Sequence, residues 1–268
     1  MKKVLIYISI GILTLIVVGV IVFESSIDHV QLPHGAVLHV LSASKNNHAR
    51  GAIILCPGGG YGYLEKWDEG YLWFPFFHRQ GYTVAMLEYR MPKQDPKVPM
   101  TDGAEAIQLM RKRAAEWGYD RNNVGIMGFS AGGHLASTLM VSKKVSVRPD
   151  FGILFYPVVS MKKELTHKRS HDHLMGENAS EQLENQYSNE LHITEKTPPA
   201  YIAVSSDDNN VNPQNAVRFY DEMRAKGRPV TLHVYPLGGH GWGYQHYDER
   251  MLEELMYWLR NRENKSSK

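Results

Sequence analysis

The most restrictive feature of this sequence is a series of short β-rich segments separated by helical patterns. Several segments, such as AIILC and FGILFY, are apolar throughout, whereas a strand with one solvated face alternates apolar and polar residues. Strands buried on both faces are typical of parallel sheets covered by helices. We therefore expect an α/β fold with a mostly parallel central sheet and helices on both faces. The candidate strands are residues 36–41, 52–56, 83–89, 123–127, 151–156, 200–205 and 230–235.

Two of the helical patterns have recognisable ends or faces. Residues 102–118 begin at Asp102, a residue type that caps helix N-termini, and end at Gly118, a residue type common just after a helix. Residues 248–262 carry an apolar stripe with the i, i+3, i+4, i+7 spacing of one helix face. We expect this second helix to pack on the sheet. The stripe consists of Leu252, Leu255, Met256 and Leu259.

The N-terminal segment differs from the rest of the chain. Residues 4–23 carry no charge and match the roughly 20 apolar residues that cross a bilayer as a helix. Lys2 and Lys3 precede them, which favours an N-terminus that stays inside and a domain that is exported. We expect residues 1–30 to form a membrane anchor with a hydrophobic helix, followed by a single α/β domain over residues 31–268 that lies outside the cytoplasm. A cleaved signal peptide, with a secreted or periplasmic product, is the alternative.

Charge and cysteine content exclude several classes of protein. Lys plus Arg number 30 and Asp plus Glu 28, so no strong basic excess favours nucleic acid as a partner. The single cysteine, Cys56, excludes an intrachain disulfide and a C-x-x-C metal site. Because Cys56 lies in the apolar run AIILC, we expect it to be a small buried residue. The spacing of His167, His171 and His173 is not that of a metal motif, and no metal site is predicted.

The segment GFSAG, residues 128–132, places Ser130 between two glycines at the end of one candidate strand and the start of a helical pattern. Small neighbours allow the sharp strand-to-helix turn known as a nucleophile elbow, in which the serine hydroxyl stands above the sheet edge. The alternative is that Ser130 is an ordinary helix N-cap. The strand before it and the helical pattern after it favour the elbow, and therefore a nucleophilic serine.

A nucleophilic serine needs a base, and the base needs an acidic partner. In elbow hydrolases these groups follow the serine in the order acid, then histidine. Asp207 and Asp208 follow the candidate strand at 200–205, and both remain possible as the acid. His240 follows the strand at 230–235 with a glycine on each side, which favours it as the base. Three other histidines in the polar segment 160–197 are assigned to the solvated surface: His167, His171 and His173.

Attack by a nucleophilic serine on a carbonyl group also needs N–H groups that stabilise the resulting oxyanion. The segment PGGG ends a candidate strand with consecutive glycines, and their unhindered backbone can present N–H groups to a substrate oxygen. We predict an oxyanion hole made by Gly59, Gly60 and Ala131, the residue after the nucleophile. A merely flexible glycine turn is the alternative.

Six motifs together resemble the bacterial α/β-hydrolase esterases related to acetyl xylan and feruloyl esterases. They are CPGGGYGYL, LEYRMP, DRNNVGIMGFSAGGHLAS, PDFGILFYPVVSM, TPPAYIAVSSDDNNV and GGHGWG. The resemblance covers nearly the whole chain after the N-terminal segment and implies an α/β-hydrolase fold. The acid of such relatives lies in a D-x-x-V pattern, which selects Asp208. Pro57 departs from the HGGG motif of lipase-type relatives.

The resemblance implies a serine carboxylesterase that removes short acyl groups, acetyl above all, from carbohydrate without a cofactor. The polar composition of residues 160–197 argues against an oily acyl chain. Aromatic rings can cover the apolar face of a sugar, and we predict this role for Tyr61 and Trp242 beside the catalytic glycines. Trp73 is assigned to the core. A prolyl-oligopeptidase-like peptidase and a non-catalytic binding protein on a hydrolase scaffold are the alternative functions.

Overall fold

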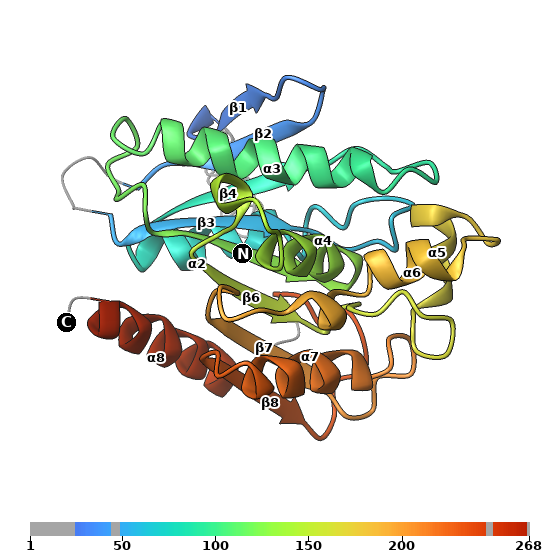
Figure 1. Cartoon of the computed structure of the whole chain (residues 1–268). Helices are drawn as coiled ribbons and strands as arrows, with labels where there is room; N and C mark the ends of the chain where they lie inside the picture. The colour runs from blue at the N-terminus through green and yellow to red at the C-terminus, as the bar shows by residue number, and fades with distance from the viewer. Residues whose placement is uncertain (1–24, 44–48, 245–248, 267–268) are drawn as a thin grey trace, which may run out of the picture.

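The computed structural model describes residues 25–43, 49–244 and 249–266. Their strands form one eight-stranded sheet in the order β1-β2-β4-β3-β5-β6-β7-β8 (Figure 1). The pairs β1–β2 and β2–β4 are antiparallel, and the remaining pairs are parallel. The strands are β1 (Asp28–Gln31), β2 (Val37–Leu41), β3 (Gly51–Cys56), β4 (Tyr82–Glu88), β5 (Val124–Phe129), β6 (Phe151–Phe155), β7 (Ala200–Ser205) and β8 (Val230–Tyr235).

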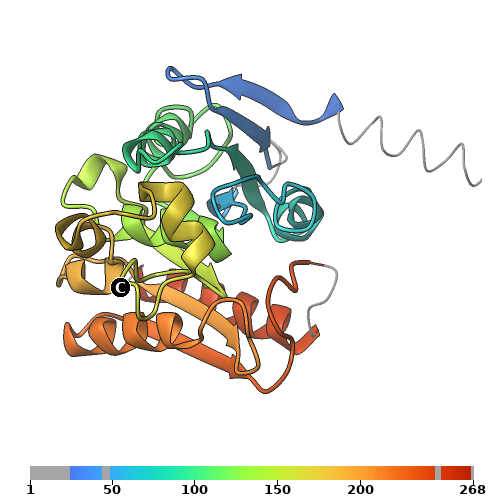
Figure 2. The same ribbon diagram turned by 90° about the vertical axis from the view of Figure 1, so that its right-hand side faces the viewer.

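Helices cover both faces of the sheet, and Figure 2 shows α2 and α3 on opposite sides of it. Side chains of α3, α4 and α7 belong to one buried cluster, and those of α2 and α8 belong to the other. The α-helices are α2 (Phe74–Arg79), α3 (Lys97–Lys112), α4 (Ser130–Met140), α5 (Lys168–Met175), α6 (Glu181–Gln186), α7 (Gln214–Ala225) and α8 (Glu249–Ser266). Short 3₁₀ helices are η1 (Tyr71–Trp73), η2 (Val145–Val147) and η3 (Asn189–His192).

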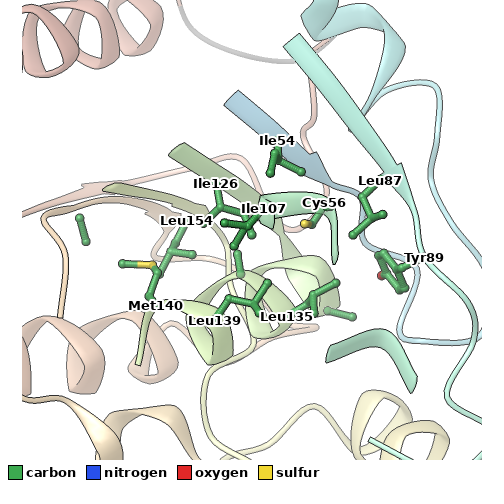
Figure 3. Close-up of a cluster of buried hydrophobic side chains, with 14 of the residues drawn as sticks. Ile54, Cys56, Leu87, Tyr89, Ile107, Ile126, Leu135, Leu139, Met140 and Leu154 are labelled. Carbon is green, nitrogen blue, oxygen red and sulfur yellow. The ribbon is translucent and has the colours of Figure 1, made fainter. Parts of the chain in front are cut away.

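Alternate residues of the central strands enter the two clusters, because successive side chains of a strand point to opposite faces. Ile54 and Ile126 pack in the cluster under α4, whereas Ile53 and Met127 pack in the cluster on the other face. Figure 3 shows the first cluster between the sheet and α4, with Cys56 among its members. Cys56 is fully buried, which confirms the expectation for the single cysteine.

All seven expected strands are present within one or two residues of their predicted ends, and the short strand β1 was not predicted. The helix predicted at 102–118 was wrong at both ends, since α3 runs from Lys97 to Lys112. Asp102 is therefore no cap. It lies buried inside the helix and accepts hydrogen bonds from the Arg90 backbone N–H at 2.8 Å and guanidinium at 2.6 Å. This ion pair ties α3 to the end of β4.

The polar segment 160–197 folds into α5, α6 and η3 rather than forming an extended loop. Buried apolar residues attach it to the domain, among them Leu165, Leu174 and Met175. The expected membrane segment, residues 4–23, lies outside the described residues. Among the helices that the structure describes, none combines the length and apolar character needed to span a bilayer.

The turn from β5 into α4 packs very closely against its neighbours near the edge of the sheet. A Cβ atom on Gly132 would lie 2.0 Å from the Cys56 carbonyl oxygen and 2.4 Å from that of Pro57. A Cβ on Gly128 would lie 2.3 Å from the Gly132 carbonyl oxygen. Both glycines of the GFSAG segment are therefore required, because Gly132 lies against the backbone at the end of β3 and Gly128 lies against the first turn of α4.

We expect Gly132→Ala to lower the free energy of unfolding by about 3 kcal/mol or more, because two backbone carbonyls would have to move. Gly103→Ala in α3 is the matched control. The added methyl there meets side-chain atoms rather than backbone, Leu139 Cδ1 at 2.6 Å and Leu135 Cδ1 at 3.3 Å, and alanine favours the helix by about 1 kcal/mol. Urea unfolding of both variants measures the difference, and equal losses would contradict the close approach at Gly132.

Candidate active site

Ser130 lies at the first position of α4, directly after β5. Its φ of 51° is in the left-handed region, which a non-glycine residue adopts only where the surrounding structure enforces it. Phe129 before it is extended, and the contacts of Gly128 and Gly132 leave no room for a wider turn. The side chain is thereby held at the carboxyl edge of the sheet, where it lines a cavity.

His240 lies in the glycine-rich loop that follows β8. Its Nε2 is 2.8 Å from Ser130 Oγ, and its Nδ1 is 2.7 Å from Asp208 Oδ2. A carboxylate only accepts hydrogen bonds, so Nδ1 carries the proton and the Nε2 lone pair faces the serine hydroxyl. The three side chains thus form one hydrogen-bonded chain, and in it Ser130 donates its proton toward the imidazole.

Asp208 is buried after β7 and has both carboxylate oxygens occupied. Oδ2 accepts from His240, while Oδ1 accepts the backbone N–H groups of Asn210 and Val211, both at 2.9 Å. These two bonds explain the D-x-x-V pattern, because a turn back to the carboxylate fixes its orientation. Asp207 has a different place: its Oδ1 accepts the Gly239 N–H at 2.8 Å and so holds the loop that carries His240.

The glycine loop after β3 faces the same cavity. Gly59 and Gly60 have φ of 116° and 62°, and a Cβ on Gly59 would lie 2.2 Å from the Tyr63 carbonyl oxygen. Within the described residues, the N–H groups of Gly59 and Gly60 donate no hydrogen bond. Ala131 belongs to the first turn of α4, whose N–H groups have no intrahelical acceptor. Gly59 and Gly60 thus line the same cavity as Ser130, and the oxyanion role of their N–H groups and of the Ala131 N–H stays a prediction.

The cavity has a volume of about 280 Å³ and is lined by residues far apart in the sequence. Polar and charged side chains dominate its wall, including Glu65, Asp68 and Glu69 from the segment after the glycine loop. His167 and Arg169 from the start of α5 also line a second cavity of about 670 Å³ beside it. The Arg169 guanidinium lies 5.5 Å from the ring centroid of Tyr63, an exposed wall residue.

The two aromatic residues predicted to contact substrate lie elsewhere, and that prediction was wrong. Tyr61 is 1% exposed and its hydroxyl bonds His134 Nδ1 at 2.9 Å. Trp242 is 6% exposed, donates its Nε1–H to Ser205 Oγ at 3.0 Å and packs on Tyr156. Both rings therefore fill the core behind the catalytic loops. Tyr63, two residues after Tyr61, is the ring that reaches the cavity.

The assignment of three histidines to the solvated surface was also wrong. His167 lines the cavity, and burial lowers its pKa. His173 donates from Nδ1 to the Gly60 carbonyl at 2.8 Å, so α5 helps to hold the glycine loop. His171 is buried and contacts Glu184. No group of His, Cys, Asp or Glu in the described part of the chain has the arrangement of a metal site.

The family model BD-FAE matches residues 38–223, which is more than half of the chain. The chain belongs to the BD-FAE family. The BD-FAE match includes the glycine loop, Ser130 and Asp208, whereas His240 lies beyond its end. With its mostly parallel sheet and the strand order described above, this BD-FAE member has the α/β-hydrolase fold that the sequence motifs predicted.

Two relatives with similar sequences have names that refer to xylan. An acetylxylan esterase of Xylanibacter ruminicola is 37% identical over 217 residues, covering 78% of this chain and 45% of that protein. Endo-1,4-beta-xylanase B of Butyrivibrio fibrisolvens is 31% identical over 207 residues, covering 72% of this chain and 32% of that protein. The chain thus spans less than half the length of both relatives.

Among solved structures, an acetyl ester-xyloside bifunctional hydrolase of Caldicellulosiruptor lactoaceticus is similar over most of both chains. The TM-score is 0.79 at 29% identity, and the match covers 85% of this chain and 89% of that one. The similarity therefore extends over most of the fold.

The different places of the two aspartates give a test. We expect Asp208→Asn to slow covalent modification of Ser130 by a fluorophosphonate by on the order of 10⁴-fold, since the imidazole would adopt the wrong tautomer. Asp207→Asn keeps an acceptor for Gly239 N–H and should cost less than about tenfold. Rates of probe incorporation compare the two variants, and the reverse ranking would contradict Asp208 as the partner of His240.

Proposed function

We propose that the protein is a serine esterase that removes short acyl groups, acetyl above all, from carbohydrate. The observation that carries this proposal is the hydrogen-bonded chain Ser130–His240–Asp208, which opens on a cavity bordered by backbone N–H donors. A hydroxyl, an oriented imidazole and oxyanion donors are the groups that acyl transfer requires.

In the proposed reaction, Ser130 Oγ attacks the carbonyl carbon of the ester while His240 Nε2 takes the hydroxyl proton. The Asp208 carboxylate stabilises the imidazolium that forms. N–H groups of Gly59, Gly60 and Ala131 stabilise the oxyanion of the tetrahedral intermediate. The carbon–oxygen bond to the sugar then breaks, and His240 returns the proton to the leaving hydroxyl. Water attacks the acyl-serine by the same steps and releases the carboxylic acid.

The size and polarity of the cavity support a short acyl group. About 280 Å³ suits a small acyl chain, and the charged wall offers little apolar surface to a long one. The second cavity beside Arg169 provides polar space outside the reaction centre for further sugar residues. The acetylxylan esterase and the acetyl ester-xyloside hydrolase among its relatives favour an acetylated xylose-based substrate.

This proposal predicts a kcat/KM at least tenfold higher on acetylated xylo-oligosaccharide than on p-nitrophenyl palmitate, because the cavity cannot bury the long chain. Ser130→Ala should abolish both activities and serves as the control for contaminating esterases. Acetate release and nitrophenol absorbance measure the two rates. Faster turnover of the palmitate would contradict the carbohydrate substrate, and preferential cleavage of peptide amides would favour the peptidase alternative.

We also propose that Tyr63, rather than Tyr61 or Trp242, stacks on the sugar. Its ring is 50% exposed at the cavity wall and is held beside Arg169. An exposed ring with a polar edge can cover one face of a pyranose. This role would explain a large aromatic side chain left in solvent next to the nucleophile.

Tyr63→Ala should therefore raise KM for acetylated xylo-oligosaccharide by roughly tenfold and change kcat/KM for p-nitrophenyl acetate by less than about twofold. Tyr257→Ala, which removes a 72% exposed tyrosine of α8, is the matched control. Equal losses on both substrates would show that Tyr63 supports the loop rather than the sugar.

A further inference from the structure

Glu69 is a buried carboxyl group in the wall of the cavity that the reaction described above does not use. It is 4% exposed, lies just before η1, and lines the same space as Ser130 and His240. Burying a carboxyl group is costly unless its oxygens are hydrogen-bonded. Both of its oxygens are bonded, and their partners belong to two different loops of the site.

One carboxylate oxygen holds the glycine loop. Glu69 Oε2 accepts the Gly58 N–H at 2.7 Å, and the Gly58 carbonyl accepts the Glu65 N–H at 3.2 Å. A Cβ on Gly58 would lie 2.7 Å from Glu69 Oε2 and 2.9 Å from Ser130 Cβ. The Gly58 residue is thus enclosed between the carboxylate and the nucleophile, so Glu69 fixes the backbone immediately before Gly59.

The other oxygen holds the loop of the base through Tyr156. Glu69 Oε1 accepts from the Tyr156 hydroxyl at 2.9 Å, and that hydroxyl accepts the Gly243 N–H at 3.0 Å. The Tyr156 ring lies edge-on to the His240 ring, with 5.0 Å between centroids. The Tyr244 N–H also donates to the Asp68 carbonyl at 3.1 Å, which joins the same two segments through the backbone.

We propose that Glu69 and Tyr156 act as one positioning unit, which holds the oxyanion donors and the His240 imidazole at fixed places around Ser130. The inference rests on the proposed function, since it assigns work to residues beside the proposed nucleophile. Neither side chain exchanges a proton or a bond with substrate. Their effect on rate comes from geometry, because a displacement of about 1 Å at the reacting groups costs on the order of 10²-fold.

Ionisation is secondary to this role. Burial raises the pKa of Glu69 to about 7, and the nearby Glu65 carboxylate also raises it. The hydrogen bonds from Gly58 and Tyr156 and the nearby His240 lower this pKa. Protonated or not, the carboxyl group keeps an oxygen that accepts the Gly58 N–H. A glutamine at position 69 should therefore retain most of the positioning effect, whereas a leucine of similar size should lose it.

The test compares Glu69→Leu, Glu69→Gln and Tyr156→Phe by kcat and KM on p-nitrophenyl acetate and by the rate of fluorophosphonate labelling. We expect Glu69→Leu to lower kcat and labelling by on the order of 10²-fold with KM within about threefold of wild type. Glu69→Gln should recover at least about tenfold of that loss. Tyr156→Phe should lose about tenfold, and the double variant Glu69→Leu/Tyr156→Phe no more than Glu69→Leu alone.

Glu184→Gln, which changes another buried glutamate outside the cavity, is the control and should retain wild-type rates. The inference would be overturned by any of three results. These are full kcat in a folded Glu69→Leu protein, losses that multiply in the double variant, and no recovery of rate in Glu69→Gln. If Glu69→Leu does not fold, the Tyr156→Phe variant decides. Wild-type rates in Tyr156→Phe overturn the inference, and a tenfold loss of kcat with unchanged KM supports it. A wild-type protein that no fluorophosphonate labels would overturn the proposed function as well, which separates the two failures.

Discussion

The first turn of α4 approaches the backbone after β3 so closely that only glycine fits at position 132. This contact brings the glycine loop and the serine turn together, and it leaves Ser130 in the left-handed conformation. The strain at one residue is offset by the packing of the whole helix, whose inner face contributes Leu135 and Leu139 to the core (Figure 3). A local constraint at the sheet edge thus depends on apolar burial further along the same helix.

Sheet topology supplies the remaining groups. The loops after β3, β5, β7 and β8 all leave the carboxyl edge of a parallel sheet, which is where ligands bind in open α/β folds. Asp208 and His240 are 32 positions apart in sequence, yet adjacent strands β7 and β8 bring their side chains to 2.7 Å. Rigid strands set the spacing, and hydrogen bonds within each loop, such as those to Asp208 Oδ1, set the orientation.

Local patterns made much of this arrangement predictable from sequence. Continuous apolar runs identified the strands, and small residues around Ser130 identified the turn. Long-range contacts did not show in the sequence. Asp102 resembles a helix cap, but its partner Arg90 comes from the end of another element. Tyr61 and Trp242 are next to glycines of the cavity wall, yet side chains of neighbouring residues can point in opposite directions. Glu69 bonds Tyr156, 87 positions away, and no local pattern marks that pairing.

In the proposed reaction, Ser130 carries the acyl group between two half-reactions. Rapid acid quenching of the wild-type protein with acetylated xylo-oligosaccharide, followed by peptide mass spectrometry, detects this acyl-enzyme. We expect one acetyl group on the peptide that contains Ser130, at that residue, and none in the Ser130→Ala protein. Ser130 would not be the acyl carrier if the wild-type protein released acetate while the acetyl group was found on another residue. Undiminished acetate release by the Ser130→Ala protein would lead to the same conclusion.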